Sequence, residues 1–299
     1  ALGTPLENLT ALALALDGSI YFTSRPAAEG NSMVGRVTPA GMIEKIVGGG
    51  ADTHNGSGDG SLASQGTITT PTAIAVGSDG SVFIGEGDDY KVRRIAPKSI
   101  ITTYAGTGTS GSNDSTGKAT SIRLSDIASL TVDDEGNLFI AEHEKSRIRR
   151  VAPDGHLSTF VTGGADFKPW NMAFGADGAA LISSDIGIGQ PATMRIWRRE
   201  LDGTLSVVAG GGIVEQNGTP ALAAAIGSPR SIAIAPDGSY FVASGVSIKR
   251  VSRTLATRNA NEVAISSPDG SEVYFFSIAG DSVGRHLRTH AGALGAVLR

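Results

Sequence analysis

The most constraining feature of this sequence is a short cassette that recurs along it. Each copy has a run of small or β-branched residues, a (D/E)-G pair and a second apolar run, which is the signature of a β-hairpin. The copies lie at Thr10–Phe22, Thr72–Ile84, Ser129–Ile140, Trp170–Ile182 and Ser231–Val242. A chain that repeats one supersecondary unit favours a repeat architecture over an irregular domain.

Two further cassettes follow each hairpin in a fixed order. One carries basic residues, as in K-V-R-R-I from Lys91, and the other ends in glycine, as in I-I-T-T-Y-A-G from Ile100. The last basic cassette, S-I-K-R-V-S from Ser247, lacks the turn that follows the others. Repeated groups of four antiparallel strands predict an all-β fold, a β-propeller of five or six four-stranded blades. The alternative is a β-sandwich, whose strands rarely repeat one pattern so faithfully.

The regular units end before a tail of different pattern. We therefore expect a propeller domain over residues 1–258 and a second region over residues 259–299. In this tail Asp269-Gly270 is followed by one extra residue before the apolar run. The pattern fits either strands that close the propeller or the start of another region.

The direction of the strands predicts that the variable segments share one end of the blades. In an antiparallel sheet of strands A, B, C and D, the A–B and C–D turns lie together, and the B–C loops lie at the opposite end with the connections between blades. The A–B turns are short and uniform, whereas the B–C loops differ in length and composition. Loops on a rigid scaffold are where function is concentrated.

The B–C loops supply the candidate binding residues: Arg25, Glu86, Asp88, Asp89, Glu142, His143, Glu144 and Asp185. Carboxylates and a histidine around one channel mouth have the chemistry to bind a ligand, and their oxygens would suit Ca²⁺ or Mg²⁺. The competing interpretation is a set of solvated loop charges, because no fixed-spacing ligand motif joins them. We therefore predict a binding face with no catalytic residues, no metal ligands and no cofactor, Ca²⁺ being the alternative.

Composition excludes several classes of function. Cysteine is absent, so there is no disulfide, zinc–thiolate site or cysteine nucleophile. A net charge of −4 argues against nucleic-acid binding, and we interpret the arginine pairs as salt bridges between blades and surface charge. No apolar run approaches the roughly 20 residues of a membrane-spanning helix. We expect neither a nucleic-acid partner nor a membrane span.

Several strings resemble a known family. G-D-G-S-L-A-S-Q at Gly58–Gln65, P-T-A-I-A-V-G-S-D-G from Pro71 and R-R-I at Arg93–Ile95 resemble NHL repeats. The insertion before the strand is similar to one in teneurins and the bacterial Rhs (YD-repeat) proteins. The stretch G-R-H-L-R-T at Gly284–Thr289 resembles a YD-repeat strand.

This resemblance implies an NHL-type propeller in a secreted or cell-surface, toxin-associated protein of the Rhs or teneurin kind. The propeller would be a non-catalytic scaffold that binds a protein or glycan partner through its variable loops and adjoins a downstream YD/Rhs shell. We therefore expect that the chain is not an enzyme. The alternatives are a metal-dependent lyase or lactonase-like hydrolase with its site at the channel mouth, and an RNA-binding NHL domain.

Overall fold

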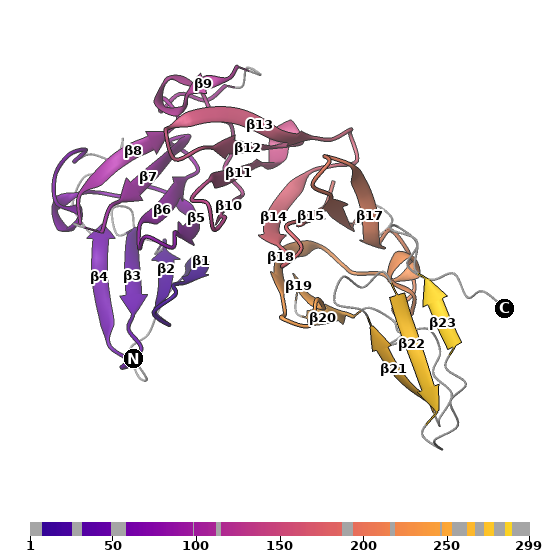
Figure 1. The fold of residues 1–299 in the computed structure, drawn as a ribbon. Helices are drawn as coiled ribbons and strands as arrows, with labels where there is room; N and C mark the ends of the chain where they lie inside the picture. Colours follow the sequence, from indigo (N-terminus) through magenta and orange to yellow (C-terminus); the bar gives the residue numbers. More distant parts are fainter. Residues whose placement is uncertain are drawn as a thin grey trace. The chain divides into compact units, whose positions relative to one another are not determined.

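The computed structural model describes most of the chain, and strands dominate it (Figure 1). The described residues are 8–25, 32–48, 58–97, 99–111, 115–186, 194–215, 219–245 and 247–252, together with three later strands. The helices among them are short 3-10 turns: η1 (Ala63–Gln65), η2 (Ala119–Ser121), η3 (His143–Lys145) and η5 (Ala221–Ala223). Contacts divide the chain into unit 1, Ala1–Met172 with Ile182–Ile186, and unit 2, Ala173–Leu181 with Gly187–Arg299.

The strands form antiparallel sheets that follow chain order. Sheet I contains β1 (Leu9–Leu14), β2 (Ile20–Ser24), β3 (Met33–Val37) and β4 (Ile43–Gly48). Sheet II contains β5 (Pro71–Val76), β6 (Val82–Glu86), β7 (Lys91–Ile95) and β8 (Ile101–Ala105). Sheet III contains β10 (Ser129–Val132), β11 (Leu138–Glu142), β12 (Arg147–Val151), β13 (His156–Thr162) and the added edge strand β9 (Gly117–Lys118).

The later sheets use the same plan. Sheet IV contains β14 (Pro169–Phe174), β15 (Ala180–Ser184), β16 (Arg195–Arg199) and β17 (Leu205–Gly210). Sheet V contains β18 (Pro229–Ile234), β19 (Tyr240–Ser244) and β20 (Ser247–Val251), and sheet VI contains β21 (Glu262–Ser266), β22 (Glu272–Ser277) and β23 (Arg285–Arg288). The predicted all-β fold of propeller type is confirmed. The Asp269-Gly270 turn lies outside the described residues, and the division at residue 258 stays a prediction.

The A–B turns share one geometry, in which aspartate and glycine have different roles. In sheet I the Ala15 N–H donates to Ser19 O at 2.9 Å, and Gly18 takes φ +81°. The Asp17 carboxylate accepts the Ser19 N–H at 2.9 Å. The other A–B turns have the same length and a glycine at similar positive φ, at 77–81, 133–137, 175–179 and 235–239. Glycine supplies the left-handed conformation, while the aspartate satisfies a backbone donor.

An arginine in strand C fixes each of these turns. Its guanidinium binds the turn carboxylate of its own sheet in the pairs Arg36–Asp17 (2.7 Å), Arg94–Asp79 (3.1 Å), Arg198–Asp177 (2.9 Å) and Arg250–Asp237 (2.6 Å). In sheet III, Arg150 instead donates to Asn137 Oδ1 at 2.8 Å. The prediction that the arginine pairs form salt bridges between blades is therefore wrong for this member of each pair. We call this contact the turn latch.

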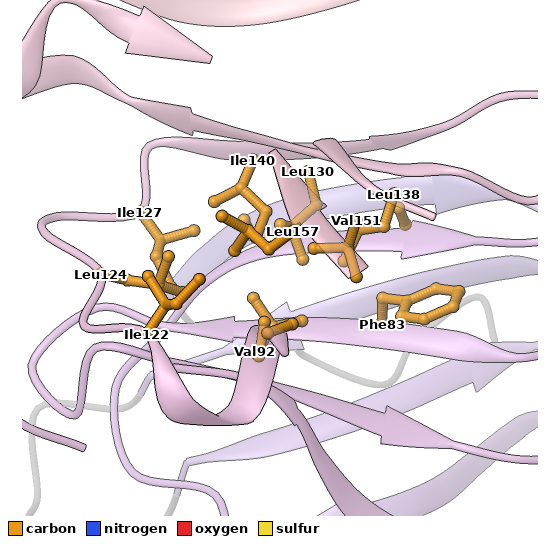
Figure 2. Close-up of a cluster of buried hydrophobic side chains, with 14 residues drawn as sticks. Phe83, Val92, Ile122, Leu124, Ile127, Leu130, Leu138, Ile140, Val151 and Leu157 are labelled. Atoms are coloured by element: carbon orange, nitrogen blue, oxygen red, sulfur yellow. The ribbon is translucent and has the colours of Figure 1, made fainter. Parts of the chain in front are cut away.

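The core of unit 1 lies between adjacent sheets. Leu130 of β10 packs with Phe83 and Val92 of sheet II, and residues of the connection between the sheets complete the cluster (Figure 2). Burying one such side chain fully is worth about 1.5–3 kcal/mol. Thr131 donates from β10 to Met172 O in β14 at 2.8 Å, and Thr72 donates from β5 to Ile127 O, just before β10, at 2.7 Å. These contacts hold the loops of neighbouring sheets in fixed relation.

Candidate functional site

All of the predicted binding residues belong to unit 1 and follow the carboxyl ends of B strands. Glu86 and Glu142 are the last residues of β6 and β11, and the others stand in the loops behind those ends: Arg25, Asp88, Asp89, His143, Glu144 and Asp185. We call the end of a sheet that carries the B–C loops and the connections its loop end, and the opposite end its turn end. The structure distributes the predicted residues among three separate groups.

The first group is centred on Glu86, which is completely buried. Its carboxylate accepts the Thr69 N–H at 3.0 Å and an Arg93 N–H at 3.5 Å. Arg93 is also completely buried, and it donates to Asp59 at 2.6 Å. Burial raises the pKa of Glu86 above its ordinary value, although Arg93 and Thr69 oppose the rise. The Glu86 carboxylate therefore joins the segment before β5 to sheet II, and it is not accessible to a ligand.

Glu142 is the corresponding buried carboxylate in sheet III, and it also joins the preceding connection to the sheet. It accepts the Ser125 N–H at 2.7 Å and pairs with Arg147 Nε at 2.5 Å. Both members of the pair are buried. In sheet IV the equivalent position is Ser184, whose hydroxyl accepts the Lys168 N–H at 2.8 Å. The last residue of strand B is thus an acceptor for the backbone that leads into strand A of the same sheet.

The basic residue in the middle of strand C anchors the same connections. Arg93 reaches Asp59, Arg149 donates to Ser115 O, and Lys249 donates to Ala225 O at 2.6 Å. Each acceptor lies in the segment that precedes its own sheet. Sheet IV follows a short connection and has Trp197 at this position. In sheets II, III and V, the residue before the strand-C arginine that binds the A–B turn therefore holds the segment that precedes the sheet. The two neighbours point to opposite faces of the sheet.

The second group is an exposed pair between the loops of sheets I and II. Arg25 lies 3.7 Å from Asp88, and both side chains are more than half exposed. Asp89 accepts the Thr69 hydroxyl at 2.6 Å. A contact of this kind between exposed charges contributes little to stability. Arg25 and Asp88 fit the predicted solvated loop charges, whereas Asp89 is tied to the Glu86 group.

The third group surrounds His143, in the loops of sheets III and IV. The His143 ring lies 4.1 Å from the Trp170 ring, centroid to centroid, and its Nε2 is 3.3 Å from Asp185 O. Asp185 is buried. Glu144 is exposed, and its carboxylate lies 3.7 Å from Lys168 Nζ. This group holds a histidine, an aromatic ring and several carboxylates in one place.

Asp126 belongs to the third group, although the sequence did not single it out. Its carboxylate accepts the Glu144 N–H at 3.0 Å and the Ser125 hydroxyl at 3.0 Å. Burial raises the pKa of Asp126 above its ordinary value, while hydrogen bonds and the charge of His143 oppose the rise. Asp126 stands three residues before strand β10, in a connection and not in a B–C loop. Its alignment with the residue before Pro71 in the second repeat was the available signal.

The predicted residues do not form one metal centre. Among the described residues there is no group of three or more His, Cys, Asp or Glu side chains that could hold a metal ion. Glu86 and Glu142 are each committed to an arginine. Within that same part of the chain, no helix has the length and apolar character needed to cross a membrane.

Comparison with known proteins finds relatives of two kinds. No protein-family model matches the chain. Mouse Teneurin-1 is 28% identical over 269 residues, which covers 78% of this chain and 10% of Teneurin-1. The chain therefore spans about a tenth of the curated relative. This match supports the predicted likeness to teneurins, while the assignment to NHL, Rhs and YD-repeat proteins stays a prediction.

The solved structures that share the fold include enzymes. Virginiamycin B lyase from Staphylococcus aureus superimposes with a TM-score of 0.50 and 17% identity, over 93% of this chain and 80% of the lyase. A gluconolactonase from Xanthomonas campestris superimposes with a TM-score of 0.54 and 13% identity, over 91% of this chain and 84% of the enzyme. These neighbours contradict the prediction that the chain is not an enzyme. That prediction rested on the absence of catalytic motifs, whereas lyases and lactonases use the same fold.

Proposed function

We propose that this chain is an enzyme of the lyase or lactonase-like hydrolase class, with its site in the His143 group at the loop end of unit 1. The observation that carries the proposal is the position of the Asp126 carboxylate beside the loop that carries His143, whose charge it feels. Asp126 holds the backbone of Glu144, the residue next to His143, and its pKa is raised mainly by burial. A carboxyl group that binds its proton more tightly than usual, beside an imidazole, is suited to general acid–base chemistry.

The arrangement assigns a role to each side chain. In lactone hydrolysis one group of the pair removes a proton from water as it attacks the carbonyl carbon. The other group gives a proton to the ring oxygen as the C–O bond breaks. In an elimination the base instead takes a proton from the carbon next to the one that bears the ester oxygen. A C=C bond forms there, the C–O bond breaks, and the oxygen leaves as a carboxylate. Trp170 supports the imidazole, and the Asp185 backbone carbonyl, 3.3 Å from His143 Nε2, orients it.

The test is a turnover assay on the purified chain. Substrates are gluconolactone and virginiamycin B, each assayed with EDTA and with added Ca²⁺ or Mg²⁺. We expect turnover that falls at least about 100-fold in His143→Gln and in Asp126→Asn, since general acid–base groups contribute that much or more. The matched control is His156→Gln, which changes an exposed histidine in β13. Absence of turnover on every substrate, or equal activity of the His143 and His156 variants, would contradict the proposal.

The likeness to Teneurin-1 over most of the chain supports a second function. We propose that the chain is a propeller module of an extracellular or cell-surface protein, with a YD/Rhs shell downstream. Its loop end would bind a protein or glycan partner through Arg25, Asp88, Glu144 and neighbouring loop residues. Binding to glycan arrays and to displayed extracellular proteins tests this. Arg25→Glu with Glu144→Lys should abolish a specific signal, and Asp202→Asn at the turn end should not.

A further inference from the structure

A cavity lies between sheets II and III at their turn end, away from the His143 group. Its volume is about 260 Å³. One wall is the turn Gly77–Asp79 and the other is the turn Asp134–Gly136. Both turns belong to unit 1, and the turn latch and the Figure 2 cluster hold their sheets in place. The walls are therefore built by fixed elements.

The inner surface of the cavity is apolar and aromatic. Phe83 and Tyr104 line it from sheet II, with ring centroids 5.0 Å apart in an edge-to-face arrangement. Val132 and Pro153 line it from sheet III. The Tyr104 hydroxyl donates to Ala152 O at 3.4 Å, which fixes the ring across the junction. A short aliphatic chain would be stabilised by burying its apolar surface against these side chains.

The rim of the cavity carries more negative than positive charge. Asp79, Asp134 and Glu135 stand on the two turns, and Arg94 is the basic residue of the lining. Arg94 is engaged by Asp79 at 3.1 Å and lies over both aromatic rings at 5.9 Å from each centroid. Asp134 and Glu135 on the opposite turn are exposed.

The Tyr104 hydroxyl is affected by burial and by charges of both signs. Burial raises the pKa of the Tyr104 hydroxyl, and Asp154 and Asp79 raise it further against the opposing effect of Arg94. The excess of carboxylates on the rim, and not this pKa, is what favours a cation.

We propose that this cavity binds a primary alkylammonium group on a short aliphatic stem. The stem lies against Phe83, Tyr104 and Val132, and the ammonium group faces Asp134 and Glu135. A compact ammonium has three donors that it can divide between the two turns, whereas a planar guanidinium needs a fixed fork geometry. The site is independent of the proposed catalytic site, because it occupies the other end of the sheets.

The test is an NMR titration of the ¹⁵N-labelled chain at constant ionic strength. The probe is n-butylammonium chloride. Sodium butyrate is the oppositely charged control, and N-butylacetamide is the uncharged control. We expect saturable shifts in the amides of Gly77–Asp79 and Asp134–Gly136 with butylammonium alone. Shifts with all three compounds, or with none, would overturn the proposal.

Two double variants test whether the rim carboxylates, and not the total charge of the protein, bind the ammonium group. Asp134→Asn with Glu135→Gln should weaken butylammonium binding about fivefold, since exposed ion pairs are individually weak. Glu44→Gln with Glu215→Gln removes the same charge from exposed positions that do not line the cavity, and it should leave affinity unchanged. Equal affinity of both double variants would refute the rim assignment. Putrescine and Nα-acetyl-lysine methylamide then identify the source: tighter binding of the first indicates a free diamine, and of the second a lysine side chain.

Discussion

The two ends of each sheet in unit 1 are held by carboxylates in opposite environments. At the turn end, Asp79 is half exposed and pairs with Arg94 on the surface. At the loop end, Glu86 is completely buried and pairs with Arg93, which is also completely buried. The turn end repeats nearly unchanged from sheet to sheet, while the loop end changes its acceptor from glutamate to serine. Repetition therefore marks the contacts that build every sheet in the same way, and variation marks the contacts that fix each loop individually.

The largest expected effect comes from removing a buried carboxylate at the loop end. Glu142→Ala should lower the free energy of unfolding by about 3–5 kcal/mol, because it leaves the buried Arg147 cation without its carboxylate. Urea denaturation measures the change. Glu144→Ala is the matched control: its side chain is exposed, and the expected change is within about 0.5 kcal/mol.

A second variant keeps this prediction informative if Glu142→Ala fails to fold. Glu142→Gln with Arg147→Met replaces both charges, and it should recover part of the lost stability because the uncompensated cation is gone. A loss below about 1 kcal/mol in Glu142→Ala would show that the pair is not desolvated as described.

Glycines provide the next sharpest contrast between the two ends. Gly106, at the loop end of sheet II, has φ +88°, and a Cβ there would lie 2.1 Å from Tyr90 O. Gly80, in the A–B turn, has φ +80° with nothing within 4 Å of such a Cβ. Gly80→Ala should cost about 1–2 kcal/mol for the left-handed conformation alone. Gly106→Ala should cost at least about 2 kcal/mol more, because the backbone must also move. Similar midpoints in urea for the two variants would contradict the contrast.

The sequence predicted the turn end well and the loop end poorly, for a physical reason. A turn such as Asp17-Gly18 is specified by neighbouring residues, through a positive φ and one short hydrogen bond, so the pattern is visible in the string. The burial of Glu86 depends on Arg93 and on the distant Asp59. Nothing local distinguishes that glutamate from the exposed Asp88 two residues later.

The candidate site follows the same rule. His143 was identified because it stands in a B–C loop. Asp126 joins it from the connection before β10 and Trp170 from strand β14, and only the tertiary fold of unit 1 brings them together. Site prediction from one repeat at a time therefore finds single residues and misses the group.

The pH dependence of stability should have opposite signs at the two ends. Partial burial opposes ionisation of Asp79, but Ser81 and Arg94 outweigh it and hold its pKa below the ordinary 3.8. Its contribution to stability is therefore present above pH 3.8 and is lost as the pH falls below that value. Burial raises the pKa of Glu86 above 4.5. Its contribution is complete below pH 4.5 and is lost as the pH rises through the raised pKa.

Two variants measure these signs. Relative to the unchanged chain, Asp79→Asn should flatten the stability profile on the acid side of pH 3.8, and Glu86→Gln should flatten it above pH 4.5. The effect of Asp79→Asn should be the smaller of the two, because its carboxylate is half exposed and water screens its charge. Urea midpoints from pH 3 to pH 8 give both profiles. Profiles that change with the same sign would refute the assignment of the two environments.

The smallest effect is expected where the loop end is most exposed. Arg25 and Asp88 are 3.7 Å apart, with side-chain exposures of 52% and 71%. Water screens such a pair, so Arg25→Ala and Asp88→Ala should each change the free energy of unfolding by less than about 0.5 kcal/mol. Their coupling in a double-mutant cycle should disappear in 1 M NaCl, where the screening length is about 3 Å. Coupling above about 1 kcal/mol that persists in salt would mean that these loops are ordered together like the buried pairs beneath them. In that case the loop end would present a fixed surface to a ligand instead of an adaptable one.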